Sequence, residues 1–278
     1  MAGNFLSKRA LSVEVLARTS SPLWRARNGF KSQNIGDHRI LFTFNNKDDV
    51  DRVLSSEPWS FDKHLVVMQL YDNEMPIQDL KFEKTTFWVQ IHGISLRYMT
   101  LEVAVKICEV VGDVLQPVAP NVFDGGSFLR VQVLVDISLP LCRGHLISLN
   151  NEKQVWVSFK HERLPSVCYW CGWLTHNDRD CECWIENEGT LRNDQKEFGS
   201  DLRAPPFKLS KKNVLSVLGI YAAKKTNCRD GHKQGGNHSA QSRPTEKTIV
   251  SKHSKHPTRS CIALVSHPSV CYANEGSI

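Results

Sequence analysis

The chain has 278 residues, of which 41% are hydrophobic and 23% are charged, and its formal net charge is +6 at pH 7. This balance excludes a wholly disordered chain and suits one medium domain or two small ones. The charge is uneven, because residues 201–278 hold 13 Lys and Arg against 4 Asp and Glu, whereas residues 1–200 hold 22 against 25. A basic extension on a slightly acidic folded part indicates an anionic partner, with nucleic acid or an anionic surface as the candidates.

Hydropathy and cysteine content limit where the protein works. No stretch has 18 consecutive apolar residues, so we expect no transmembrane helix and no membrane partner. The first 24 residues lack the apolar core of a secretory signal, and a surface helix explains their basic residues as well as a transit peptide does. We therefore expect an intracellular protein, in the nucleus or the cytoplasm, whose nine cysteines are thiols or metal ligands rather than disulfides.

The first 72 residues alternate between the apolar spacing of helices and that of strands. The expected elements are a helix over 6–17 that stops at Pro22, strands over 24–30 and 39–44, a helix capped by Asn46, and a strand over 65–70. This order is that of an α+β, ferredoxin-like (RRM-like) domain, β-α-β-β-α-β, with its first strand absent. A missing strand predicts a sheet with an exposed edge or a hole.

Residues 73–162 predict a strand-rich continuation, and residues 187–278 predict a basic, mostly disordered tail. The continuation should hold strands over 86–91, 128–137 and 154–161, and a helix capped by Thr100. After about Asn187 the periodicity fades into a polar composition that cannot bury a core. Four segments follow: 1–72, 73–162, 163–186 and 187–278.

Between these segments stands a C-x2-C-x4-H-x4-C array, formed by Cys168, Cys171, His176 and Cys181. Three thiolates and one imidazole are a soft, four-coordinate set that suits zinc. Because the protein fills all four positions, the array predicts one structural zinc ion and no catalytic residue. Cys183 is a rival fourth ligand, and free thiols in a loop are the alternative.

Aromatic and basic side chains surround the predicted zinc ligands. Tyr169, Trp170 and Trp173 could stack on unpaired bases, and Arg163, Arg179 and His161 could reach phosphates. The alternative is that one or two of the rings only cover the zinc site. Phe42 and Phe44 also share one strand face, but without the Lys/Arg-Gly-Phe signature of RNA-binding sheets we expect them in the core.

Three segments together resemble a known plant family. They are PWSFDKHLVV (58–67), FWVQIHGISLRYMTLEVAVKI (87–107) and FKHERLPSVCYWCGWLTHNDRDC (159–181). This combination resembles proteins in which a DUF4283 domain precedes a C-x2-C-x4-H-x4-C zinc knuckle. It is similar to the Gag-like, nucleic-acid-binding part of plant non-LTR retrotransposons and of host genes derived from them.

The resemblance assigns roles residue by residue. It implies that the Cys3His array holds zinc, that Gly172 is the small residue after the second cysteine, and that Trp59, Trp88, Gly93 and Leu96 are core or turn residues. Thr175 departs from the pattern, because knuckles usually have glycine there. The resemblance also implies that the family's first strand would precede this chain.

The function predicted from the sequence is a non-enzymatic, zinc-dependent module that binds single-stranded RNA or DNA and no small-molecule substrate. The alternative is a protein-interaction or self-assembly module in which the knuckle is only structural. An enzyme is disfavoured, because the sequence has no phosphate-cradling glycine loop, HExxH site or G-x-S-x-G elbow.

Overall fold

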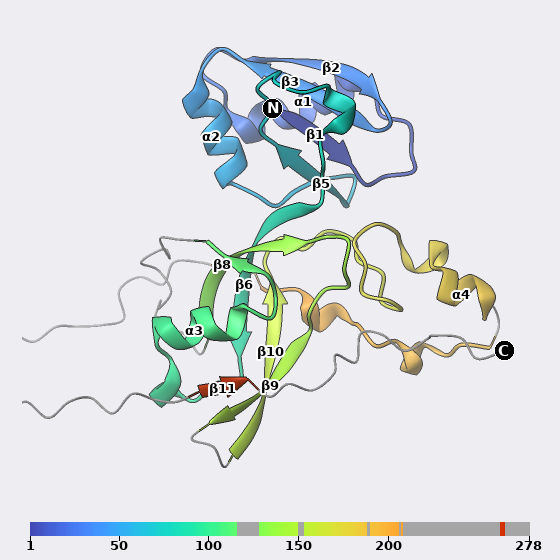
Figure 1. Ribbon diagram of the computed structural model, residues 1–278. Helices are drawn as coiled ribbons and strands as arrows, with labels where there is room; N and C mark the ends of the chain where they lie inside the picture. Colours follow the sequence, from blue (N-terminus) through green and yellow to red (C-terminus); the bar gives the residue numbers. More distant parts are fainter. Residues whose placement is uncertain (116–127, 150–152, 188–189, 206, 208–261, 265–278) are drawn as a thin grey trace, which may run out of the picture. The chain divides into compact units, whose positions relative to one another are not determined.

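The computed structural model describes residues 1–115, 128–149, 153–187, 190–205, 207 and 262–264 (Figure 1). These residues form two antiparallel sheets with flanking helices, so the mixed α and β class is confirmed. Within these ranges, no helix has the length and apolar character needed to cross a membrane.

The first sheet has five strands in the order β2-β3-β1-β5-β4. Its elements, with the two helices that flank it, are β1 (Ala2–Phe5), α1 (Val13–Trp24), β2 (Phe30–Gly36), β3 (Arg39–Phe44), α2 (Lys47–Ser55), β4 (Trp59–Phe61) and β5 (His64–Gln69). The edge strands are β2 and β4, and all pairings are antiparallel.

The prediction that the first strand is absent is wrong. β1 lies in the middle of the sheet, where Gly3 is paired with Ile40 on one side and Met68 on the other. Its sequence, AGNF, carries no strand signal, because glycine and asparagine are depleted in strands. Pairing on both sides and the burial of Ala2 and Phe5 stabilise it instead, so the sheet has no hole.

Helix α1 begins and ends later than the sequence predicts. Ser12 caps its N-terminus by accepting a hydrogen bond from the Val15 N–H. The helix continues through Pro22 and ends at Trp24, so the strand predicted over 24–30 is also wrong. Trp24 is buried and lies edge-on to Phe42, with ring centroids 4.8 Å apart. This packing outweighs the poor helix propensity of proline in the last turn.

Both helices pack on the same face of the first sheet (Figure 1). The aromatic side chains of β1 and β3, which are Phe5, Phe42 and Phe44, all belong to this packed layer, and Phe42 is buried as predicted. The opposite face contributes Ala2, Leu65 and Val67 to the second core. That face therefore offers no ring from the central strands for stacking on bases.

The second sheet has six strands in the order β11-β9-β10-β6-β8-β7. The strands and their helix are β6 (Lys84–His92), α3 (Leu101–Cys108), β7 (Asp113–Val114), β8 (Leu129–Asp136), β9 (Gly144–Leu149), β10 (Lys153–His161) and β11 (Ile262–Leu264). The inward side chains of β6, β8 and β10 form its core with α3. Thr100 caps α3 by accepting from the Val103 N–H, as predicted.

Packed structure extends past residue 187, where the tail was predicted to begin. Leu202, in a short 3-10 helix (Ser200–Leu202), is buried, and the Ala204 N–H donates to the carbonyl of His161. The sequence could not predict this packing, because too few apolar side chains are buried in this stretch to give a helical or strand periodicity. The predicted disorder of residues 206, 208–261 and 265–278 lies outside the described residues. β11, from the predicted tail, pairs with β9.

Candidate metal centre

The loop after β10 turns sharply at Cys168–Gly172. The Gly172 N–H donates to the Cys168 carbonyl at 2.8 Å, and the Cys168 N–H donates to the Trp173 carbonyl at 2.9 Å. Gly172 has a φ of +78°, which L side chains rarely adopt. A Cβ at this position would also overlap the Phe198 ring. The turn therefore requires glycine for its backbone and for its packing.

The structure brings the four predicted ligands together. The Sγ atoms of Cys168, Cys171 and Cys181 and a ring nitrogen of His176 all lie within 4.8 Å of one another. Zinc–sulfur bonds of ~2.3 Å in a tetrahedron place sulfur atoms ~3.8 Å apart, so this spacing fits a zinc ion. Cys183, the rival ligand, is exposed and does not belong to the cluster.

Neighbouring groups orient these donors. The Thr175 Oγ1 lies 3.2 Å from His176 Nδ1, while His176 Nε2 lies 3.2 Å from Cys171 Sγ. A proton on Nδ1, donated to the threonine hydroxyl, leaves the Nε2 lone pair free to bind a metal. Thr175, which departs from the family pattern, thus holds the histidine by the ring nitrogen that faces away from the cluster.

The metal-free protein has shifted pKa values at two of the cluster cysteines and at its histidine. A hydrogen bond with the Cys171 side chain, together with burial, raises the pKa of Cys168 well above its ordinary value. Burial raises the pKa of Cys181 to about 11. Burial also lowers the pKa of His176, which keeps its imidazole neutral. Zinc must displace the thiol protons, so its affinity should fall as the pH falls.

Backbone and side-chain contacts anchor this loop to the second sheet. Leu174 is buried in the second core, and the Leu141 N–H donates to the Gly172 carbonyl at 3.0 Å. The Phe198 N–H donates to the Tyr169 carbonyl at 3.1 Å. The candidate centre is therefore part of the packing of the second sheet and not an independent unit on a linker.

Two of the three predicted base-stacking rings have intramolecular partners. Trp170 stacks on Trp184 with ring centroids 5.2 Å apart, and Lys196 Nζ lies 4.9 Å from the Trp170 centroid and 6.0 Å from that of Tyr169. Sequence reasoning missed Trp184 and Lys196, which lie beyond the ligand array. Trp173 is half-buried, and the described residues show no ring or cation against it.

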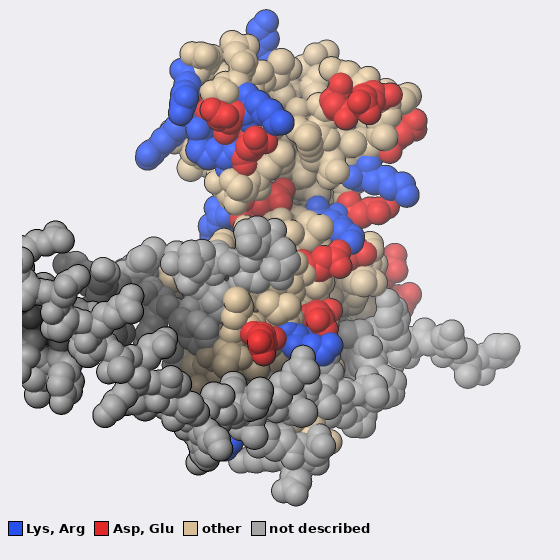
Figure 2. Space-filling model, turned by 60° about the vertical axis from the view of Figure 1, so that its left-hand side comes forward, with Lys and Arg blue, Asp and Glu red and all other residues tan. Residues whose placement is uncertain are grey.

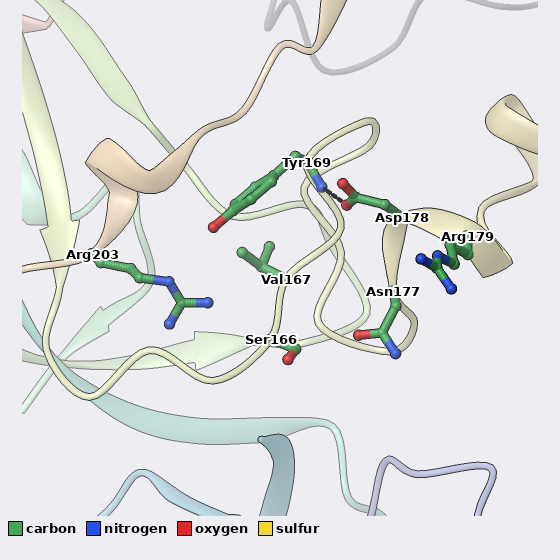
Figure 3. A pocket seen from close by; sticks show the side chains of 7 residues that line it. All are labelled: Ser166, Val167, Tyr169, Asn177, Asp178, Arg179 and Arg203. Carbon is green, nitrogen blue, oxygen red and sulfur yellow. Dashed lines mark hydrogen bonds between the residues drawn. The ribbon is translucent and has the colours of Figure 1, made fainter. Parts of the chain in front are cut away.

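Tyr169 and Arg179 line one pocket of about 370 Å³ beside the knuckle, with Asn177 and Arg203 among the other walls (Figure 3). In Figure 3 the hydroxyl end of Tyr169 and the guanidinium of Arg203 both point into the space between them, and Arg179 lies on the far side. Arg179 is exposed. The sequence did not predict a role for Arg203, because its segment was assigned to the tail.

The two remaining predicted phosphate contacts differ. His161 is fully buried, edge-on to Phe87 at 5.7 Å, and burial lowers its pKa to about 4, so the prediction that it reaches phosphates is wrong. It continues the buried alternation of Val157 and Phe159, a signal that the sequence already held. Arg163 is exposed but donates to the carbonyls of residues 56 and 57.

Comparisons with known proteins agree with this geometry. Residues 1–76 match the family described as a domain of unknown function, DUF4283, and residues 135–183 match the family described as a zinc knuckle. The chain thus carries a DUF4283 match followed by a zinc-knuckle match. The zinc-knuckle match begins in β8 and includes β9 and β10, so it contains the strands from which the metal-binding loop extends.

An uncharacterized protein of Arabidopsis thaliana is similar to part of this chain. The two are 26% identical over 134 residues, which make up 48% of this chain and 42% of the relative. The similarity therefore spans less than half of the relative's length. The comparison with solved structures gives no significant match.

Proposed function

We propose that this DUF4283 and zinc-knuckle protein is a non-enzymatic, zinc-dependent binder of single-stranded RNA or DNA. The observation that carries the proposal is the closed Cys3His cluster next to Trp173, a half-buried ring of the same loop. Bound zinc would supply no reaction, because four protein donors leave no open position, and it would hold the loop rigid. A rigid ring is a good platform for an unpaired base.

The charged groups support two separate contributions to binding. Figure 2 shows Lys and Arg interspersed with Asp and Glu on the face that it draws, without a continuous basic tract over the described residues there. The positive surplus lies in residues 201–278. We assign the specific contact to Trp173 and Arg179 beside the zinc, and a salt-sensitive, sequence-independent contribution to the basic tail.

The proposal is tested by fluorescence anisotropy of a labelled single-stranded oligonucleotide with the zinc-loaded full-length protein. We expect Trp173→Ala to weaken binding about 10-fold, in line with the loss of one stacked base. Trp156→Ala is the matched control, because Trp156 is 52% exposed on β10 and outside the knuckle. Equal affinities of the two variants would reject Trp173 as the stacking platform.

We also infer that residues 1–72 adopt a ferredoxin-like fold. We further infer that the protein is a retrotransposon Gag-like protein or derives from one. The strand order β2-β3-β1-β5, with α1 and α2 on one face, supports the first inference. The likeness of the three sequence segments to Gag-like proteins supports the second.

The second candidate function is self-assembly, with the knuckle as a structural staple. It is favoured by the contacts of Trp170 with Trp184 and Lys196, which occupy a ring that could otherwise bind a base. The edge strand β2 is exposed along much of its length and offers a pairing surface. Light scattering of the full-length protein tests this function, since a monomer at all concentrations would exclude it.

A further inference from the structure

A second cavity, of about 630 Å³, lies away from the knuckle ligands and is large enough for a nucleotide. Its walls come from the end of α2 and the loop after it, from β6 and β8, from the loop after β10, and from residues 203–205 and 207. The side chains that bear on its chemistry are Glu57, Trp88, Arg130, Arg163, Arg203 and Phe207. None of the four zinc ligands lines it.

The guanidinium groups of this cavity are not all neutralised. Arg130 forms a bidentate ion pair with Glu162, with N···O distances of 2.7 and 2.8 Å. Among the described residues, Arg163 and Arg203 form no ion pair and donate to backbone carbonyls instead. An arginine has five N–H donors, so both keep donors for an anion. This leaves an excess of positive charge.

Aromatic rings enclose Arg130 in the same cavity. Its Cζ lies 3.6 Å from the centroid of Trp88 and 4.3 Å from that of Phe207. Trp88 is half-buried on the central strand β6. Planar rings and guanidinium groups in layers are the surfaces on which nucleic-acid bases stack.

Glu57, another residue that lines the cavity, has a buried carboxyl group. Glu57 is 6% exposed and accepts a hydrogen bond from the Thr86 N–H through Oε2 at 3.1 Å. Its Oε1 is buried and meets no donor at good hydrogen-bond geometry among the described residues. It offers an acceptor for an amino group or a ring N–H on the edge of a base.

We propose that this cavity binds one nucleotide, with its phosphate at Arg163 and Arg203 and its base against the stack that Trp88, Arg130 and Phe207 form together. The proposal adds a second contact to the proposed function and rests on it. The ligand is a residue within a bound single strand or a free mononucleotide, since both present the same phosphate and planar base.

The test uses the zinc-loaded full-length protein and calorimetric titration. The ligands are the four ribonucleoside 5′-monophosphates, the matching nucleosides, inorganic phosphate and a single-stranded oligonucleotide. We expect at least one monophosphate to bind more tightly than its nucleoside and than phosphate. Phe207→Ala and Arg163→Lys should weaken that binding at least 5-fold, whereas Arg97→Ala, an exposed control outside the cavity, should not change it.

The outcomes distinguish a nucleotide within a single strand from a free mononucleotide. They also distinguish binding in this cavity from binding at Trp173. If Phe207→Ala weakens only the oligonucleotide, the ligand is a residue of a strand; if it weakens the mononucleotide as well, the cavity also takes the free ligand. Unchanged affinity for both would overturn this proposal even where Trp173→Ala abolishes strand binding. Unchanged melting temperatures of the variants show that the fold is intact.

Discussion

Gly172 illustrates how one residue can decide the geometry of a metal site. Its positive φ and its contact with Phe198 both exclude a side chain. We expect Gly172→Ala to lower the free energy of unfolding by about 3 kcal/mol, through backbone strain and overpacking, and to weaken zinc binding. Urea unfolding of the zinc-loaded protein, with a zinc titration, measures both effects.

Gly29 provides the control for this substitution. Its φ of +69° is similar, but no atom lies within 4 Å of the position that a Cβ would take there. Gly29→Ala should therefore lower the free energy of unfolding by about 1 kcal/mol, through backbone strain alone, and leave the zinc affinity unchanged. Equal losses in the two variants would show that the Phe198 contact does not matter.

Glu57 should make stability depend on pH. Burial raises its pKa from 4.5 to about 7. Because the folded-state pKa is raised, its contribution is fully present below pH 4.5 and is lost as the pH rises through 7, by at most about 3 kcal/mol. Glu57→Gln should remove this slope. We expect the free energy of unfolding of the variant, relative to wild type, to increase between pH 4.5 and 7; a constant difference would contradict the assignment.

At the scale of single residues, the sequence predicted the metal ligands because their spacing alone encodes the cluster. It could not predict the Arg130–Glu162 ion pair or the stacking of Trp170 on Trp184, because these contacts depend on how distant segments pack. The burial of His161 could have been predicted, because it continues the alternation of buried side chains at Val157 and Phe159.

At the scale of elements, β1 shows the limit of local signals. Its four residues have poor strand propensity and are stabilised by two neighbouring strands, which a single sequence does not reveal. The long apolar strands β5, β6 and β10 were predicted from their periodicity. Helix α1 lies later in the chain than predicted, because the burial of Trp24 determines where the helix ends.

The central position of β1 has a direct consequence. Deleting residues 1–5 removes a strand that pairs with both β3 and β5, so we expect amide hydrogens in those strands to exchange at least 100-fold faster. Of the described residues, a deletion of 262–278 removes β11, an edge strand of the second sheet, and should leave the exchange of β3 and β5 unchanged. Hydrogen exchange measured by mass spectrometry distinguishes these outcomes. Unchanged protection of β3 and β5 after the first deletion would show that β1 is dispensable.

At the scale of the whole molecule, the charge and the chemistry lie in different places. The candidate zinc centre belongs to the slightly acidic residues 1–200, whereas the positive surplus lies in residues 201–278. Packing of Leu174 in the second core ties the zinc-binding loop to the sheet. Loss of zinc should therefore abolish the specific contact while leaving the weak attraction of the tail for any polyanion.

The most direct test compares Cys171→Ser with Cys183→Ser in the full-length protein. Metal analysis and oligonucleotide anisotropy are measured on the same samples at low salt. Cys171 belongs to the four-donor cluster and Cys183 does not. We predict that Cys171→Ser loses its zinc and at least 10-fold in affinity, while Cys183→Ser keeps one zinc ion and wild-type binding. Full affinity in a zinc-free Cys171→Ser protein would contradict zinc-dependent nucleic-acid binding.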